Sequence, residues 1–405
     1  MLHKAIAKLA KWDHSFRNIM VIRALYQSFA ASLPIITIAV YWRLIDRLFL
    51  SPNSLFPTIF NYNAPHLFDP QLMQVLTNMA DYAVVLVLTI TFTQAYLQDR
   101  MVSQNVLPVI INFSVIFLLT LLNFQAQSRP TIQYLTIFLF VWLSCESFYW
   151  LERLLRFRPA TFGYVNLLWM TLIVVVAIIG STWTAPYLLQ GSYPDLFSLE
   201  FFTHFWGLLV TAALAPLTVW LGLSLPTDLS SNIIDLTPVT TNLNAIYEST
   251  SATLSYPENL YSVLATFAFI GGVGSTLALT FWLLFAKSKH NRKIGYLSFI
   301  PSLFDNSQIL LFGLPSMLRP LTIVPMILSS LASTTIGYTA IKLGLMKPTV
   351  WAAPGDIPHI LLGFVASESQ FQALAFVLLS FIISIFIYKP FVKYLDQEAL
   401  LNEVQ

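Results

Sequence analysis

The chain carries little charge. Of its 405 residues, 10% are Asp, Glu, Lys or Arg, whereas 57% are hydrophobic and 15% are aromatic. A soluble domain has about 25% charged residues, which cover its surface, so this composition excludes a water-soluble enzyme. The net charge of +2 leaves no basic stripe that could neutralise phosphates, which argues against a nucleic-acid partner.

Cysteine is almost absent. The single Cys145 lies in an apolar run, which excludes internal disulfides and cysteine-rich metal sites. No spacing of His, Cys, Asp and Glu resembles a metal site, and no pairing of a nucleophile with a base stands out. We therefore expect neither a metal nor a cofactor.

Long apolar runs dominate what is present. A helix needs about 20 apolar residues to cross a hydrocarbon core of about 30 Å. The clearest runs are 24–42, 79–97, 105–124, 131–150, 164–184, 201–225, 261–286, 319–346 and 371–391. They predict an all-α polytopic membrane protein with about ten transmembrane helices. Residues 1–20, with Ile6, Leu9 and Ala10 on one face, favour an amphipathic helix on the membrane surface.

The polar residues divide the chain into unequal halves. Residues 1–190 are plain apolar helices, which suits a scaffold and a dimer surface, whereas residues 191–395 contain interrupted, polar segments. Lys- and Arg-rich loops place the N-terminus inside, although Arg43 and Arg47 then lie near the outer face. Broken segments often mark the substrate site of a transporter.

Two further expectations concern less regular segments. Six crossings bring the chain inside near residue 226, and the basic cluster 287–293 should also be inside. Because one apolar run separates these two points, the polar segment 227–260 must add a crossing or re-enter the membrane. Residues 396–405 should form a polar cytoplasmic tail.

The first segment that could carry chemistry is rich in glycine. Gly271, Gly272 and Gly274 allow close backbone approach, and Ser275 and Thr276 add hydroxyl groups. This pattern serves either close helix packing or a backbone lining for a polar ligand. It is not a phosphate loop, because no Lys follows at the required spacing.

The second segment has four consecutive polar residues between apolar flanks. They are Asp305, Asn306, Ser307 and Gln308. Such a cluster is costly in lipid, so it should face a cavity or other protein, unless it is a short loop at the membrane surface. A carboxylate with carboxamides suits sugar hydroxyls, which both donate and accept hydrogen bonds.

The third segment contains Pro354, Gly355 and Pro358, which preclude a regular helix. Asp356 and His359 pair at a re-entrant tip in one interpretation, and the segment is a plain loop in the other. All three segments are too polar or irregular to face lipid, so we expect them to converge around one cavity near the bilayer midplane.

His204 lies just inside the sixth run. A His within an apolar span is a candidate functional residue, and here it is the one candidate for catalysis. The alternative is an interfacial His beside the aromatic Phe205 and Trp206.

In this order, the segments resemble the membrane subunit (enzyme IIC) of the bacterial sugar phosphotransferase system, in the lactose, cellobiose and diacetylchitobiose class. The similarity is carried by IRALYQSFAASLPII at 22–36, IGGVGSTLAL at 270–279, FAKSK at 285–289, FGLP at 312–315, GYTAIKLGL at 337–345 and YKPFVKYL at 388–395. The resemblance implies ten spans with two re-entrant hairpins in the bacterial inner (cytoplasmic) membrane. It also implies a homodimer formed mainly by the first half, and one sugar in the second half of each protomer.

In such systems a cytoplasmic IIB subunit phosphorylates the incoming sugar from a phosphocysteine. The family carries a His-Gly pair in its sixth span and an Asn-Glu-Pro triplet before FGLP. Alignment on Pro216 puts Phe205 at the His position, one residue after His204, and alignment on FGLP puts Gln308 at the Glu position. A Gln forms hydrogen bonds but does not act as a base.

Two functional hypotheses follow from the resemblance. In the first, the chain is an enzyme IIC-like component that binds a sugar, expected to be a disaccharide, and translocates it inward. In the alternative, it is a degenerate enzyme IIC-like sensor that regulates a signalling domain, for example a cyclic-di-GMP phosphodiesterase. We predict that the sugar is bound and that it is phosphorylated poorly or not at all.

Overall fold

The structure is a computed structural model that describes most of the chain. It leaves undescribed residues 1, 51–54, 61–69, 103–105, 125–132, 156–161, 185–202, 224–236, 249–253, 354–356 and 405. The described residues form helices and connecting turns, with one isolated antiparallel bridge between Thr349 and Ser367. This is the all-α fold that the composition predicts.

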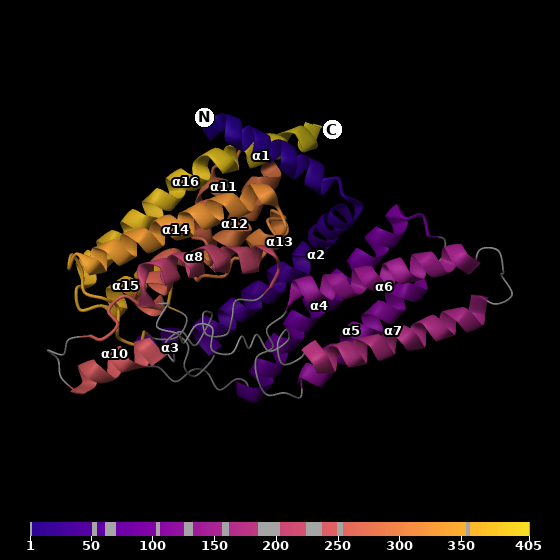
Figure 1. The fold of residues 1–405 in the computed structure, drawn as a ribbon, viewed down its shortest axis with the longest axis horizontal. Coiled ribbons are helices and arrows are strands. Elements are labelled where there is room, and N and C mark those ends of the chain that lie inside the picture. Colours follow the sequence, from indigo (N-terminus) through magenta and orange to yellow (C-terminus); the bar gives the residue numbers. More distant parts are fainter. Residues whose placement is uncertain are drawn as a thin grey trace.

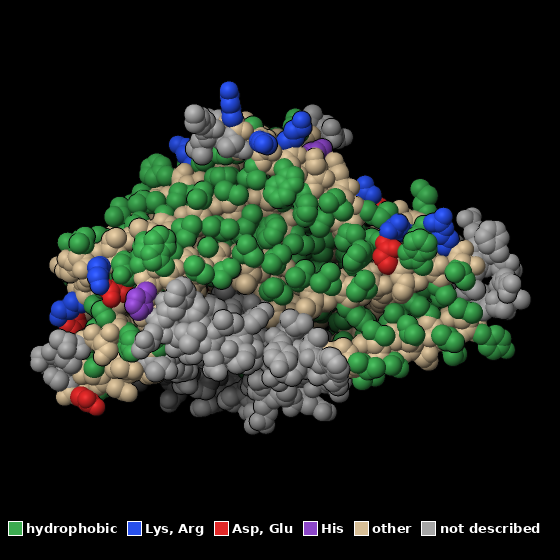
Figure 2. Space-filling view, viewed as in Figure 1, with side chains coloured by type: hydrophobic (Ala, Val, Ile, Leu, Met, Phe, Trp, Pro, Cys, Tyr) green, Lys and Arg blue, Asp and Glu red, His purple; other side chains and the backbone are tan. Residues whose placement is uncertain are grey.

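Several helices are suited to a bilayer. Those long and apolar enough to cross it are Met20–Pro57, Val75–Asp99, Tyr134–Leu154, Pro320–Lys342 and Gln370–Leu401, and shorter apolar helices are Val106–Leu119, Tyr164–Gly180 and Phe205–Trp220. Figure 2 shows a broad hydrophobic face with charged groups gathered toward its edges, as a membrane-embedded protein requires. These helices confirm a polytopic membrane protein, and the total of ten spans stays a prediction.

The first half is assembled around one central helix, α4, which packs on α2, α5 and α6. Its elements are α2 (Met20–Ile45), the π-helical η1 (Asp46–Leu50), α3 (Leu55–Phe60), α4 (Pro70–Asp99), α5 (Val106–Phe124), α6 (Tyr134–Leu155) and α7 (Phe162–Thr184). Phe138 meets Phe29 and Phe92 edge to face, with ring centroids 5.8 and 5.5 Å apart. Figure 1 shows α4–α7 together on one side of the molecule.

The second half has shorter and more broken elements. They are α8 (Phe205–Trp220), α10 (Thr237–Glu248), the π-helical η6 (Leu260–Ala268), α11 (Thr276–Leu284), α12 (Lys289–Leu303), α13 (Gln308–Gly313), α14 (Pro320–Lys342), α15 (His359–Ala366) and α16 (Gln370–Val404). The long α14 packs on α8, η6 and α16. Within the expected crossing 227–260, the described helix α10 has 12 residues, fewer than the ~20 that a span needs.

The seventh apolar run, residues 261–286, is not one helix. It consists of η6 and α11, separated by a turn in which Gly271, Gly272, Gly274 and Ser275 all have positive φ. A Cβ at Gly271 would lie 2.3 Å from the Cβ of Leu277, so this backbone course requires glycine there. Hydropathy alone suggests one continuous helix, and the structure differs because glycine makes the left-handed turn possible.

Helix α13 joins the two halves. The ring of Phe312 packs edge to face on Phe29 of α2 and on Tyr134 of α6, at centroid distances of 4.9 and 5.1 Å. All three rings belong to the large core cluster of the first half or pack against it. The polar run 305–308, which leads into α13, is therefore anchored to the scaffold.

The N-terminal helix α1 (Leu2–Arg17) packs on the protein. Its apolar face is the expected one, because Ile6 is 2% exposed and Leu9 and Ala10 pack beside it in a shared core. That face packs on α14 and α16. The location of α1 at the membrane surface stays a prediction. Figure 1 shows α1 and the end of α16 side by side.

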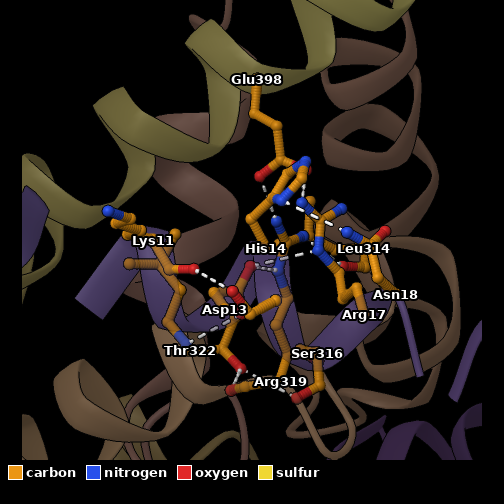
Figure 3. A network of polar contacts seen from close by, with 12 residues as sticks. Lys11, Asp13, His14, Arg17, Asn18, Leu314, Ser316, Arg319, Thr322 and Glu398 are labelled. Carbon is orange, nitrogen blue, oxygen red and sulfur yellow. Dashed lines mark hydrogen bonds and ion pairs between the residues drawn. The ribbon is translucent and has the colours of Figure 1, made fainter. Parts of the chain in front are cut away.

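An ion-pair network fastens α1 to these helices (Figure 3). Arg319, at the start of α14, bonds Asp13 at 3.2 Å and Glu398 at 2.7 Å, and Arg17 pairs with the same two carboxylates. Asp13 is 1% exposed and also accepts a 3.3 Å bond from the backbone N–H of Leu321. The expected tail 396–405 continues α16 as far as Val404 and contributes Glu398 to this network.

Candidate functional site

Asp305 connects the three segments singled out from the sequence. Its Oδ1 accepts a 2.6 Å hydrogen bond from the backbone N–H of Gly271, and its Oδ2 accepts a 2.7 Å bond from the backbone N–H of His359. Asp305 follows α12 with φ near 60°, a left-handed conformation that Asp tolerates better than most residues. One carboxylate thus holds together parts of the glycine segment, the polar run and the third segment.

His359 stands beside this carboxylate. Its Nδ1 lies 2.8 Å from Asp305 Oδ2, and its ring meets Phe269 edge to face at 6.3 Å. Burial lowers the pKa of the imidazole, but the charge and hydrogen bonding of Asp305 outweigh burial and raise the pKa above its ordinary value. Asp356, the expected partner of His359, lies outside the described residues, and the carboxylate found beside His359 is that of Asp305.

Gln308 is held by the first half of the chain. Its Oε1 accepts a 2.7 Å hydrogen bond from Arg43 Nη2, and the same nitrogen lies 2.8 Å from Asp81 Oδ1. Arg43 comes from α2 and Asp81 from α4, and the side chain of each is less than one-fifth exposed. These contacts link both halves at the position where the family resemblance expects a Glu.

Arg43 and Asp81 were missed as site residues in the sequence. In the sequence, Arg43 is an exception to the charge distribution between the loops, and Asp81 lies within the apolar run 79–97. A usable signal existed, because an ionisable residue inside an apolar span is by default a functional candidate with a nearby partner. Applied to all spans, this rule would have selected both residues.

The glycine turn packs against the polar run. Gly271, Gly272, Gly274 and Thr276 are all buried, and the Thr276 hydroxyl donates to the carbonyl of Gly271. A Cβ at Gly272 would lie 3.0 Å from Ser307 Oγ, so glycine lets the polar run approach the turn. This geometry favours the close-packing interpretation of the glycine segment, with one N–H directed at Asp305.

Asn306 and Ser307 complete the polar run. Asn306 Oδ1 accepts a 3.1 Å bond from the backbone N–H of Gln308, and all four residues of the run are half-buried. His204 takes a different place, because it is exposed at the N-cap of α8, with its Nδ1 3.4 Å from the Thr203 hydroxyl. Both interpretations of His204 stay predictions.

Comparison with known proteins gives a family match within the chain. Residues 157–330 match the family model described as "Phosphotransferase system, EIIC". Among curated relatives, the cellobiose-specific EIIC component of Lactococcus lactis subsp. lactis (strain IL1403) is 35% identical over 127 residues, 31% of this chain and 26% of the relative. The lichenan permease IIC component of Bacillus subtilis (strain 168) is 31% identical over 136 residues, 33% of this chain and 30% of the relative.

Two further matches were found. The lactose-specific EIICB component of Streptococcus mutans serotype c (strain ATCC 700610 / UA159) is 34% identical over 143 residues, 34% of this chain and 24% of the relative. The matched stretches thus span about a quarter to a third of these relatives' lengths. The solved structure of the transporter ChbC, the IIC component from the N,N'-diacetylchitobiose-specific phosphotransferase system, aligns with 96% of both chains at 18% identity and a TM-score of 0.46.

Proposed function

We propose that this chain, whose residues 157–330 match the phosphotransferase system EIIC family, binds a sugar beside Asp305 and moves it inward across the bacterial inner membrane. A disaccharide is the expected cargo, because the curated relatives include components named for cellobiose and lactose. The expected partner is a cytoplasmic IIB subunit, and fusion of the two components in a relative named EIICB supports this expectation.

The observation that carries the proposal is the carboxylate of Asp305, which joins three broken segments. Around it, Asn306, Ser307 and Gln308 place two amides and one hydroxyl in a half-buried position. Polar, irregular backbone is tolerated at membrane depth only where protein or a wet cavity surrounds it. Discontinuous segments of this kind supply the substrate site in many transporters.

The alternative is a degenerate enzyme IIC-like membrane sensor that regulates a signalling domain and does not transport, and Gln308 favours it because it does not suit phosphotransfer. Transfer of a phosphoryl group to a sugar hydroxyl releases the hydroxyl proton, which a carboxylate at this position could accept. The amide of Gln308 takes no proton, and its oxygen is already hydrogen-bonded to Arg43. Binding without phosphotransfer is therefore the outcome that this site supports best.

Homodimer formation through the first half is also proposed. Helix α7 turns a stripe of apolar side chains outward, and Leu168, Leu172 and Val176 are 64%, 52% and 50% exposed. Such a stripe suits lipid or a second copy of the chain. Cross-linking in membranes through cysteines introduced on α7 should give dimers, and finding monomers alone would contradict this assembly.

A paired measurement tests the main proposal. Calorimetry would follow disaccharide binding by the purified protein, and phosphosugar formation would be followed in proteoliposomes with purified IIA and IIB subunits. We expect binding with little or no turnover, and Gln308→Glu should raise turnover. Turnover equal to that of an ordinary family member would contradict the altered site. If no sugar binds, the proposed function is wrong.

A further inference from the structure

The amide of Gln308 has a fixed orientation. A guanidinium group carries only donors, so the atom of Gln308 that faces Arg43 must be the carbonyl oxygen. The 2.7 Å contact between Arg43 Nη2 and Gln308 Oε1 has this arrangement. The amide nitrogen Nε2 is consequently turned away from Arg43. Where a Glu would present only acceptors, this chain presents a donor.

Asn306 is oriented by the same argument. The backbone N–H of Gln308 can only donate, so the side-chain atom of Asn306 that it meets at 3.1 Å is the oxygen Oδ1. Its Nδ2 therefore points elsewhere. Among the residues that the structure describes, neither amide nitrogen has a hydrogen-bond partner, and neither is a fully buried orphan. Both N–H₂ groups are available to a ligand.

The acidic group of the run is directed into the protein. Asp305 uses Oδ1 for Gly271 and Oδ2 for the backbone and ring of His359. The polar groups of the run that form no hydrogen bond to a described residue are the two amide N–H₂ groups and the Ser307 hydroxyl, which lies beside Gly272. That hydroxyl is the one group of the three that can also accept a hydrogen bond.

A neutral sugar hydroxyl fits this arrangement in fewer ways than a carboxylate does. When it accepts from the two amides, its own proton needs an acceptor, and Ser307 is the available side chain in the run. A carboxylate has no proton to place and accepts several hydrogen bonds at once. Its bonds are also charge-assisted, which makes them about twice as strong as neutral ones.

The charges around the run permit an anion. Asp81 faces Arg43, and Asp305 faces His359, so each carboxylate of the site is already opposite a cationic or titratable nitrogen. We propose that the site selects an acidic sugar, whose carboxylate is bound by Asn306, Ser307 and Gln308. This inference rests on the proposed function and gives its ligand a chemical class.

The test compares two disaccharides that differ in one group. Cellobiose and cellobiouronic acid, in which a carboxylate replaces a hydroxymethyl group, would be titrated into the purified full chain in an isothermal calorimeter. We expect the acid to bind at least about tenfold more tightly, the ratio that one charge-assisted bond provides. Gln308→Glu should abolish this preference, because it places a like charge beside the ligand.

Two further variants serve as a second test of the site and as a matched control. Asn306→Asp changes the second amide in the same way and should also remove the preference, so the test survives if one variant fails to fold. Gln397→Glu makes the same change at an exposed position of α16 and should leave the preference unchanged. Cellobiose binding as tight as or tighter than the acid would overturn the inference while leaving sugar binding intact. Binding of neither would overturn the proposed function itself.

Discussion

At the scale of single residues, the side chain of Asp305 holds distant segments of the chain together. It adopts a left-handed backbone conformation and ties two backbone N–H groups from distant segments to one side chain. The sequence could identify it as a costly polar residue in an apolar context. It could not identify its partners, because Gly271 and His359 lie 34 and 54 positions away and no local pattern connects them.

Removal of this carboxylate should loosen all three segments. Asp305→Ala leaves the N–H groups of Gly271 and His359 without their acceptor, and each such loss costs about 1–3 kcal/mol. We expect a clearly lower midpoint of thermal unfolding in detergent and loss of sugar binding. Asp305→Asn retains one acceptor oxygen and should lose less. If Asp305→Ala unfolds at the parental temperature, these bonds do not hold the segments together.

His359 should make stability depend on pH. Its pKa is raised in the folded protein, because Asp305 outweighs the effect of burial. The stabilisation is therefore complete below the ordinary His pKa of about 6.5, and it is lost as pH rises through the higher folded pKa. Unfolding midpoints of the parent and of His359→Gln, compared between about pH 6 and pH 9, should differ most at the acidic end. A constant difference across this range would contradict the pairing.

At the scale of elements, hydropathy located the apolar helices well and the broken ones poorly. Runs 79–97 and 164–184 lie within α4 and α7, because an uninterrupted apolar sequence leaves the backbone no better choice than a helix. Run 261–286 appeared equally apolar, yet its glycines turn the chain between η6 and α11. Average hydropathy does not register the φ angles that a glycine permits, so this break escaped it.

The glycine turn offers a matched pair of substitutions. Gly271→Ala adds a Cβ 2.3 Å from Leu277 Cβ at a φ of +78°, whereas Gly344→Ala meets no atom within 4 Å at a φ of +67°. Both variants bear the left-handed penalty of about 1–2 kcal/mol, and only the first bears the clash. We expect Gly271→Ala to unfold at a markedly lower temperature than Gly344→Ala. Equal midpoints would show that the turn relaxes to accept the side chain.

At the scale of the whole molecule, the division into a scaffold half, residues 1–190, and a sugar-site half, residues 191–395, stays a prediction. The contacts between these halves were not predictable, because Arg43 reaches Gln308 across 265 positions and Phe312 inserts between rings of α2 and α6. The apolar face of α1 is visible in the sequence, but its contacts with α14 and α16 are not. A sequence shows that a face must be buried, but lipid and protein satisfy that need equally well.

The ion-pair network between α1, α14 and α16 should contribute strongly to stability. Asp13→Asn removes a charge that is 1% exposed and leaves Arg319 facing fewer carboxylates. Breaking a buried ion pair costs about 3–5 kcal/mol, whereas an exposed pair is worth about 0–1 kcal/mol. Glu368→Gln, which breaks the exposed pair with Lys347, is the control. Thermal unfolding should separate the two variants, and equal midpoints would mean that the network is stabilised by other contacts.

The joining of α1 to α16 has a mechanical consequence. Asp13 and Arg17 in α1 take part in the same ion-pair network as Glu398 in α16. A pulling force applied to residues before α1 and after α16 therefore acts on this network first. The helices between α1 and α16 bear no tension until these ion pairs break. Single-molecule extension should therefore begin with one short rupture step, followed by sequential extraction of helices, and Asp13→Asn should weaken that first step alone.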